Sequence, residues 1–286
     1  MKVIIHANNN GYGLSKDIEV LRSVLDGHDL TIVAASREAK GRFDIAFHVE
    51  HLQTRNFDSA KVNVAIPNPE WLSRGMVHNL RRCDFAIAKT QDTSDILREQ
   101  YPEVTTYFTG WTSPDPGIRS SERGICHLAG MSPLKSTHAV VQALADLRLP
   151  ALVHSGRIPS IRPPNIHFVK QRSPSPPYHL NIQVLPSQYE GFGHAINEAL
   201  ACGCTVITTD APPMNTFGST YLVKTTGHHR QNAARIWHLD PTDLRRKIIE
   251  AHENAPIFDP KARDGYLERD RAFRTAFKTL PIWTSA

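Results

Sequence analysis

Two glutamates and the turn between them are the residues of this sequence best suited to chemistry. Glu190 comes directly before Gly191–Gly193, and seven residues separate it from Glu198. Glycines let the backbone approach a ligand closely. The N–H groups at a helix start have no internal partners and suit a diphosphate or a sugar oxygen, and carboxylates accept hydrogen bonds from hydroxyls. The pattern therefore predicts a site for a ligand that carries hydroxyls and phosphate.

A strand before this turn and a helix after it must hold it in place. We expect a strand over Ile182–Leu185, a helix that opens at His194 and ends at Ala201, and a further strand over Thr205–Thr209. Open α/β sheets bind ligands at the carboxyl ends of their strands, where this turn would lie. One glutamate alone could merely favour the helix dipole or face solvent. Their combination with the glycine turn favours a binding role.

Short runs rich in branched residues alternate with helical stretches along the whole chain. The expected strands are 3–5, 30–34, 44–47, 62–66, 84–88, 124–128, 151–154 and 166–169. The expected helices are 14–25, 93–99, 134–147, 241–252 and 261–280, and 109–123 is expected as a linker. This rhythm predicts parallel sheets with helices on both faces. We expect an N-terminal domain over 1–115, a C-terminal domain over 116–265, and a C-terminal helix over 266–286 that can cross back to the N-terminal domain.

Composition limits the class of protein without identifying a ligand. The 286 residues are enough for one large domain or two smaller ones, and the net charge of +5 favours the arrival of anions. No targeting segment and no apolar run of about 18 residues is visible. We therefore expect no transmembrane segment. The cysteines lack paired zinc-type spacing and are expected to be reduced, which predicts a cytoplasmic protein. They are Cys83, Cys126, Cys202 and Cys204.

The stretch from Glu190 to Ala199 resembles the donor-site signature of retaining GT-B glycosyltransferases of group 1, E-G-F-G-x-x-x-x-E-A. The resemblance implies an α/β GT-B fold, in which two Rossmann-like domains carry parallel sheets that face a central cleft. It implies that Glu190 contacts the transferred sugar and that Glu198 holds the ribose of the nucleotide. The backbone of the turn would contact the sugar or diphosphate. The donor-binding residues expected there are Gly191, Phe192, Gly193 and His194.

A second stretch, Gly130–Thr137, resembles the segment that follows the first strand of the family's C-terminal domain. The resemblance implies that Lys135 opens a helix and binds the donor diphosphate. The family usually has a basic residue where this chain has Met131, so one of two phosphate-binding charges is absent. Ser132 is expected to bind the donor. The missing charge can be compensated by Ser132, by the helix N-terminus or by a basic residue elsewhere. A solvated lysine in a first helical turn is the alternative for Lys135.

The N-terminal half resembles the family more loosely. Gly11 and Gly13 lie where these enzymes have a glycine-rich turn that faces the donor, although an ordinary strand-to-helix turn explains them equally well. Glu50 and His51 follow a strand, at a place where the family often has a residue that contacts the sugar or the acceptor. We include both as candidate catalytic residues, with a polar surface turn as the alternative.

The resemblance implies retaining transfer of a sugar from a nucleotide-sugar donor to the hydroxyl of an acceptor, a glycan or a small molecule. Lys135 and the helix start would stabilise charge on the leaving diphosphate, which is usually the largest catalytic contribution. We expect no metal and no cofactor, because no convincing aspartate pair is present.

Three other functions remain open. The basic pI, Arg81-Arg82 and a basic proline-rich loop over 155–178 permit a sugar transferase that acts on hydroxymethylated bases of viral DNA. Met131 favours a GT-B protein that binds without catalysis. A nucleotide-sugar epimerase of the same architecture would convert the donor without an acceptor.

Overall fold

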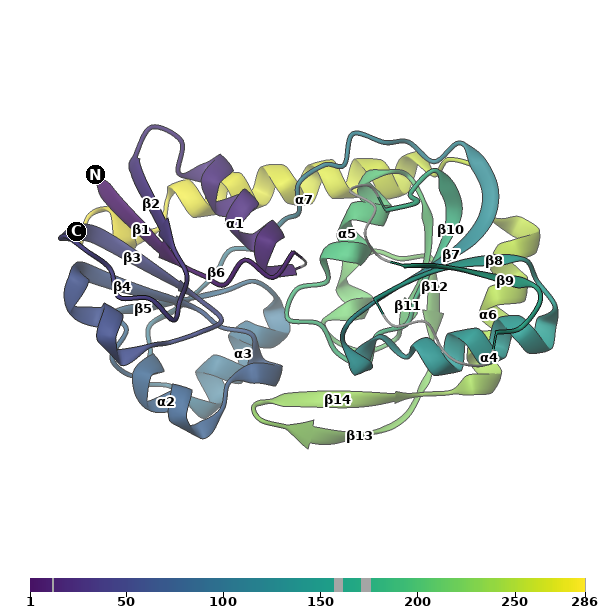
Figure 1. Cartoon of the computed structure of the whole chain (residues 1–286), viewed down its shortest axis with the longest axis horizontal. Coiled ribbons are helices and arrows are strands. Elements are labelled where there is room, and N and C mark those ends of the chain that lie inside the picture. The colour runs from purple at the N-terminus through teal and green to yellow at the C-terminus, as the bar shows by residue number, and fades with distance from the viewer. Residues whose placement is uncertain (12, 157–161, 171–175, 286) are drawn as a thin grey trace. The chain divides into compact units, whose positions relative to one another are not determined.

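The computed structural model describes residues 1–11, 13–156, 162–170 and 176–285, and within it the chain forms two compact units. Unit 1 comprises residues 1–114, 230–234 and 269–286, and unit 2 comprises residues 115–229 and 235–268 (Figure 1). Parts of the basic loop over 155–178, among them Arg157 and Arg172, lie outside the described residues.

Unit 1 is built on a parallel sheet in the order β2-β1-β3-β4-β5-β6. Its strands are β1 (Lys2–His6), β2 (Asp29–Val33), β3 (Phe43–Val49), β4 (Ala60–Ile66), β5 (Phe85–Ala88) and β6 (Thr106–Phe108). The central strands are buried along nearly their whole length, as in β3, where Ile45, Phe47 and Val49 are fully buried. Continuous apolar runs of this kind are typical of parallel strands covered on both faces.

Helical segments connect these strands. They are α1 (Gly13–Val24), η1 (Thr54–Ser59), η2 (Pro69–Trp71), α2 (Arg74–Leu80) and α3 (Gln91–Gln100). The sequence pattern did not predict α2 or β6. The Thr90 hydroxyl caps α3 by accepting a hydrogen bond from the Thr93 N–H at 3.1 Å. The end of α7 (Pro260–Lys278) and η5 (Pro281–Trp283) complete the unit.

The first residues of the expected linker pack within unit 1, where Trp111, Thr112 and Ser113 are buried. The Trp111 ring packs edge-on against Phe273 of α7, with 5.0 Å between the ring centroids, within unit 1. The change from unit 1 to unit 2 falls between residues 114 and 115.

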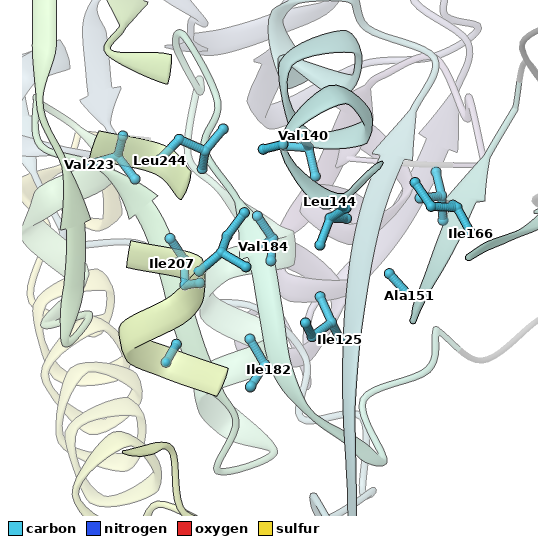
Figure 2. Close-up of a cluster of buried hydrophobic side chains, with 14 of the residues drawn as sticks. Ile125, Val140, Leu144, Ala151, Ile166, Ile182, Val184, Ile207, Val223 and Leu244 are labelled. Carbon is cyan, nitrogen blue, oxygen red and sulfur yellow. The ribbon is translucent and has the colours of Figure 1, made fainter. Parts of the chain in front are cut away.

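Unit 2 is built on a second parallel sheet, in the order β12-β11-β10-β7-β8-β9. Its strands are β7 (Glu122–Gly130), β8 (Ala151–Ser155), β9 (Ile166–Lys170), β10 (Leu180–Leu185), β11 (Thr205–Thr209) and β12 (Tyr221–Val223). Its helices are η3 (Pro133–Lys135), α4 (Thr137–Leu147), α5 (His194–Ala201), η4 (Met214–Phe217) and α6 (Pro241–Asn254). Figure 2 shows Val140 and Leu144 of α4 above Ile125 and Val184 of the sheet, in the core of this unit.

The helix expected from residue 134 begins later. Residues Pro133–Lys135 form the short 3₁₀ turn η3, and Ser136 adopts a left-handed conformation at φ 54° before α4 starts at Thr137. A residue other than glycine in this region interrupts a helix. Lys135 therefore lies in the turn before the helix and does not open it.

A two-stranded hairpin is the largest element that the sequence pattern did not predict. It consists of β13 (Thr225–Gln231) and β14 (Ala234–Leu239), joined by a two-residue turn with Asn232 at φ 52°. The tip of the hairpin belongs to unit 1, where the Asn232 side chain donates to the Glu70 carbonyl at 2.7 Å. The rest of the hairpin belongs to unit 2.

The cysteines agree with the expectation of free thiols. All four are buried and unpaired, and burial raises the pKa of the Cys83 and Cys202 thiols to about 12. Such thiols are inert at neutral pH. Across the described residues, every helix is too short or too polar to cross a membrane.

Candidate active site

The glycine turn after β10 takes the form expected from the sequence, and α5 runs from His194 to Ala201 as predicted. Gly193 precedes the helix at φ 108°, a conformation that side chains rarely adopt. A Cβ there would also lie 3.1 Å from the Phe217 ring. This position therefore requires glycine for two independent reasons.

We expect Gly193→Ala to lower the free energy of unfolding by at least about 1–2 kcal/mol, the usual cost of left-handed backbone. Gly117→Ala is the matched control, because Gly117 also has a positive φ but has open space around its Cα. Chemical denaturation of both variants measures the difference. Equal losses would show that the Phe217 contact costs nothing.

The structure brings the two motifs of unit 2 together. Lys135 forms an ion pair with Glu190 Oε1, and the Ser187 hydroxyl donates to the same oxygen. The side chains of Lys135 and Glu190 are 21% and 12% exposed. The Gln188 N–H donates to the Leu134 carbonyl at 2.7 Å, which fastens the two turns by their backbones. The pair is thus reachable from solvent but held in place.

Topology explains this meeting. The turn with Lys135 follows β7, and the turn with Glu190 follows β10. These two parallel strands are neighbours in the sheet, so their carboxyl ends lie side by side. The Thr209 hydroxyl at the end of β11 donates to the Ser187 carbonyl and adds support from the next strand.

Glu198 has a different environment from Glu190. It is only 4% exposed, and the Tyr178 hydroxyl donates to its Oε2 at 2.8 Å. Burial, together with the Glu198 carboxylate, raises the pKa of Tyr178 well above its usual range, so the phenol stays a donor. Tyr178 was not predicted, since the sequence between it and Glu198 has no pattern that pairs them.

Of the other predicted residues of the turn, Phe192 is buried in packing contacts and His194 is partly exposed. Phe192 is buried, and its ring packs edge-on against Phe217 and against His194, with 5.4 and 5.0 Å between ring centroids. Only the backbone of Phe192 is therefore suited to a ligand. His194 is partly exposed at the first position of α5, and Gly191 precedes it in the turn.

Ser132 already has an internal role. Its hydroxyl accepts a hydrogen bond from the Leu134 N–H at 3.2 Å and caps η3. Met131 beside it is 46% exposed, so the position that lacks a basic residue lies at the surface.

A buried histidine packs next to the turn that carries Lys135. His127 of β7 contacts the Val184 carbonyl at 2.6 Å and the Thr137 hydroxyl at 3.0 Å. Burial, with a smaller contribution from the charge of Lys135, lowers the pKa of His127 to about 4, although the hydrogen bond with the Val184 carbonyl opposes this shift. His127 is therefore neutral at physiological pH and adds no second cation beneath Lys135.

The predicted residues of the N-terminal half lie in unit 1. Gly11, at φ 72°, and Gly13, at the start of α1, are exposed and lie on either side of residue 12, which is outside the described ranges. The Asn9 side chain accepts hydrogen bonds from the Gly11 N–H, at 3.2 Å, and from the Ser15 hydroxyl. An asparagine that bonds the backbone two residues on is an ordinary turn feature.

Glu50 and His51 form a cluster with Asn68 at the carboxyl ends of β3 and β4. The Asn68 amide donates to Glu50 Oε2 at 2.6 Å, and His51 Nε2 lies 3.4 Å from Glu50 Oε1. Glu50 has φ 62° although it is not glycine. Such strain costs about 1–3 kcal/mol and is common at functional sites. The sequence contains no motif that identifies Asn68 as the partner of Glu50.

Two further buried pairs of side chains lie in unit 1. His6 and His48 stack at 5.0 Å, and burial lowers the pKa of His6 to about 3 and that of His48 to about 4, so both rings are neutral. Lys89, directly after β5, forms a 3.0 Å ion pair with Asp17 of α1, and both side chains are 2% exposed. Within the described ranges, no three His, Cys, Asp or Glu side chains are grouped so as to hold a metal ion.

Comparisons with known proteins agree with this architecture. The pneumococcal O-GlcNAc transferase GtfA, solved with UDP and GlcNAc, superposes with a TM-score of 0.65 at 16% identity over 84% of this chain and 57% of that one. HepE of Anabaena, solved with UDP, superposes with a TM-score of 0.61 at 14% identity, and the match covers 96% of both chains. Sucrose-phosphate synthase of Thermosynechococcus elongatus superposes with a TM-score of 0.57 at 16% identity, over 82% of this chain and 70% of that one.

The class of protein follows from these likenesses: the chain has the GT-B fold, with two Rossmann-like units. It spans little more than half the length of the pneumococcal enzyme. Residues 163–255, which include the glycine turn and both glutamates, match the model of the family described as Glycosyl transferases group 1. No curated protein sequence matches the chain.

Proposed function

We propose that this protein is a retaining glycosyltransferase that moves a sugar from a nucleotide-sugar donor to an acceptor hydroxyl. The observation that carries the proposal is the Lys135–Glu190 pair, held beside the glycine turn within the segment that matches the family. The solved proteins GtfA and HepE hold UDP, so a uridine nucleotide is the first donor to test. The acceptor is a glycan or a small molecule, or a hydroxymethylated base of DNA.

In this proposal the donor separates the ion pair. Glu190 accepts hydrogen bonds from the hydroxyls of the transferred sugar, and Lys135 turns to the diphosphate. The backbone N–H groups at the start of α5 also face this anion. His194 lies at the same helix end and is proposed to contact the diphosphate or the sugar.

The reaction then needs little from the protein beyond charge stabilisation. The bond between the anomeric carbon and the phosphate oxygen breaks, and the sugar becomes oxocarbenium-like. The acceptor oxygen bonds to the anomeric carbon from the same face, and its proton passes to the leaving phosphate oxygen. Lys135 stabilises the charge on the diphosphate throughout. We propose no metal and no cofactor for this step.

Glu198 is proposed to hold the ribose. A carboxylate can accept hydrogen bonds from both hydroxyls of a diol. The Tyr178 hydroxyl fixes the orientation of the Glu198 carboxylate by the hydrogen bond that it donates to Oε2. Glu50 and His51 are proposed to contact the acceptor or sugar, with Asn68 holding Glu50 in place. A cytoplasmic location remains a prediction, supported by the free cysteines.

Thermal shift with UDP, GDP, ADP and TDP tests the donor site. We expect one nucleotide to stabilise the wild type and to bind Glu198→Gln more weakly by about 1–3 kcal/mol, the cost of losing charge-assisted hydrogen bonds. Glu253→Gln, at an exposed site in α6, is the matched control.

Each outcome of this experiment has a clear meaning. Unchanged affinity in Glu198→Gln would defeat the ribose assignment. No shift with any nucleotide would favour a GT-B protein that binds without catalysis, the alternative that exposed Met131 supports. Conversion of a nucleotide-sugar without any acceptor would favour an epimerase.

A further inference from the structure

A histidine lies next to the hydrophobic core of unit 2. His127 is buried on the same face of the sheet as Ile125, because side chains two residues apart in a strand point to one side. Ile125 belongs to the core cluster of this unit. A ring with two polar nitrogens costs free energy in such a place unless both nitrogens form hydrogen bonds. The partners of the two nitrogens therefore show what this ring connects.

The two nitrogens of His127 have different partners, which determine where the ring proton lies. Nδ1 lies 2.6 Å from the Val184 carbonyl oxygen, and a carbonyl can only accept, so Nδ1 carries the proton. The ring is neutral because burial lowers its pKa to about 4. Nε2 therefore has no proton and accepts a hydrogen bond from the Thr137 hydroxyl, 3.0 Å away. These contacts are compatible with only one of the two neutral tautomers.

The two hydrogen bonds of His127 join three elements of unit 2. His127 belongs to β7, Val184 belongs to β10, and Thr137 is the first residue of α4. The bond with Thr137 ties the helix to the strand before it, across the loop that carries Lys135. The bond with Val184 ties β7 to the strand that leads to the turn with Glu190. One ring therefore fastens the strand before each partner of the Lys135–Glu190 ion pair.

The loop between β7 and α4 has a backbone that needs support from side chains. It turns twice through the left-handed region, at Gly130 with φ 59° and at Ser136 with φ 54°. Ser136 is not glycine, so this conformation is unfavourable by itself. In the described residues of α4 and its N-cap, the Ser136 hydroxyl caps no N–H group of the helix. The hydroxyl of Thr137, the next residue, instead fixes the start of the helix through its bond with His127.

We propose that His127, through Thr137, is a positioning residue that holds Lys135 against Glu190. As a statement about sugar transfer this rests on the proposed function, whereas the placement of the ion pair does not. A cation stabilises a leaving diphosphate best when it is held in place before the reaction. Displacement of a catalytic group by about 1 Å can lower the rate by about 100-fold. His127 and Thr137 thus act on turnover without touching the donor.

Thr137→Val tests the effect on turnover, because valine has nearly the shape of threonine but no hydroxyl. We expect kcat to fall about tenfold, with a smaller change in KM, since Lys135 acts on charge that grows in the transition state. Thr137→Ser restores the hydroxyl and should keep the wild-type turnover. Thr242→Val, at an exposed position in the first turn of α6, is the matched control and should also keep it.

The same substitution in a second background separates positioning from a general loss of structure. In Lys135→Ala, the additional change Thr137→Val should have no further effect on kcat, because the two residues act as one unit. A loss of the same size in both backgrounds would show that Thr137 acts on the fold and not through Lys135. That result, or full turnover in Thr137→Val, would overturn the proposal.

Nuclear magnetic resonance tests the placement of the pair without any sugar transfer. Long-range correlation of ring protons and nitrogens should show the His127 proton on Nδ1. Glu190→Gln should shift the Lys135 Cε resonance more in Thr137→Ser than in Thr137→Val, where the pair is no longer held. A proton on Nε2, or equal shifts in both proteins, would overturn the proposal. If the spectra are as expected but no nucleotide-sugar supports transfer, the proposed function fails and the positioning of Lys135 stands.

Discussion

Lys135→Ala should lower the turnover of sugar transfer by about 10²–10³, the usual cost of removing one preorganised donor from a developing oxyanion. Lys135 pairs with Glu190 in the turn after β10 and is the cation that the proposed function assigns to the leaving diphosphate. The exposed Met131 supplies no second charge at the neighbouring position. The loss should therefore appear mainly in kcat, since charge on the diphosphate grows in the transition state.

Steady-state kinetics with the nucleotide-sugar identified by thermal shift measures this loss. Lys247→Ala is the matched control, because Lys247 is a partly buried cation of unit 2 that pairs with Glu250 in α6, away from the glycine turn. Lys135→Arg should recover part of the rate, since it restores the charge but not its position. Full turnover in Lys135→Ala would remove the phosphate role from this residue.

The sequence predicted the bounds of the strand and the helix that flank the glycine turn. β11 and α5 have the expected bounds, because their buried branched residues and the glycines beside them mark their ends. The pairing of Lys135 with Glu190 was implied only by the family resemblance, which placed both residues at one donor. The error at the start of α4 has a local cause, the left-handed Ser136, which no residue type signals.

Other features had no signal in the sequence. The hairpin β13–β14 is rich in polar residues and lacks the branched runs that mark the buried strands, so its pattern resembles a loop. Tyr178 and Glu198 are 20 residues apart, and Lys89 and Asp17 are 72 apart. Side-chain pairs at such separations depend on the tertiary fold, and no local periodicity reports them.

The Lys89–Asp17 pair leads to the largest expected effect on stability. Both side chains are almost fully buried within unit 1, with Lys89 Nζ 3.0 Å from Asp17 Oδ2. Lys89→Met should lower the free energy of unfolding by about 3–5 kcal/mol, because it removes the ammonium group that pairs with the buried Asp17 carboxylate. The double variant Lys89→Met/Asp17→Leu should recover much of this loss, since it removes both charges.

Urea denaturation followed by tryptophan fluorescence measures this change, because Trp111 and Trp283 both belong to unit 1. Lys61→Met is the control, because the exposed Lys61 pairs with Asp44 at the amino ends of the neighbouring strands β4 and β3 and its loss should leave the midpoint unchanged. A loss below about 1 kcal/mol in Lys89→Met would contradict this stabilising role of the ion pair. The expected pattern would instead show that this ion pair fastens α1, and with it the turn that carries Gly11 and Gly13, to the end of β5.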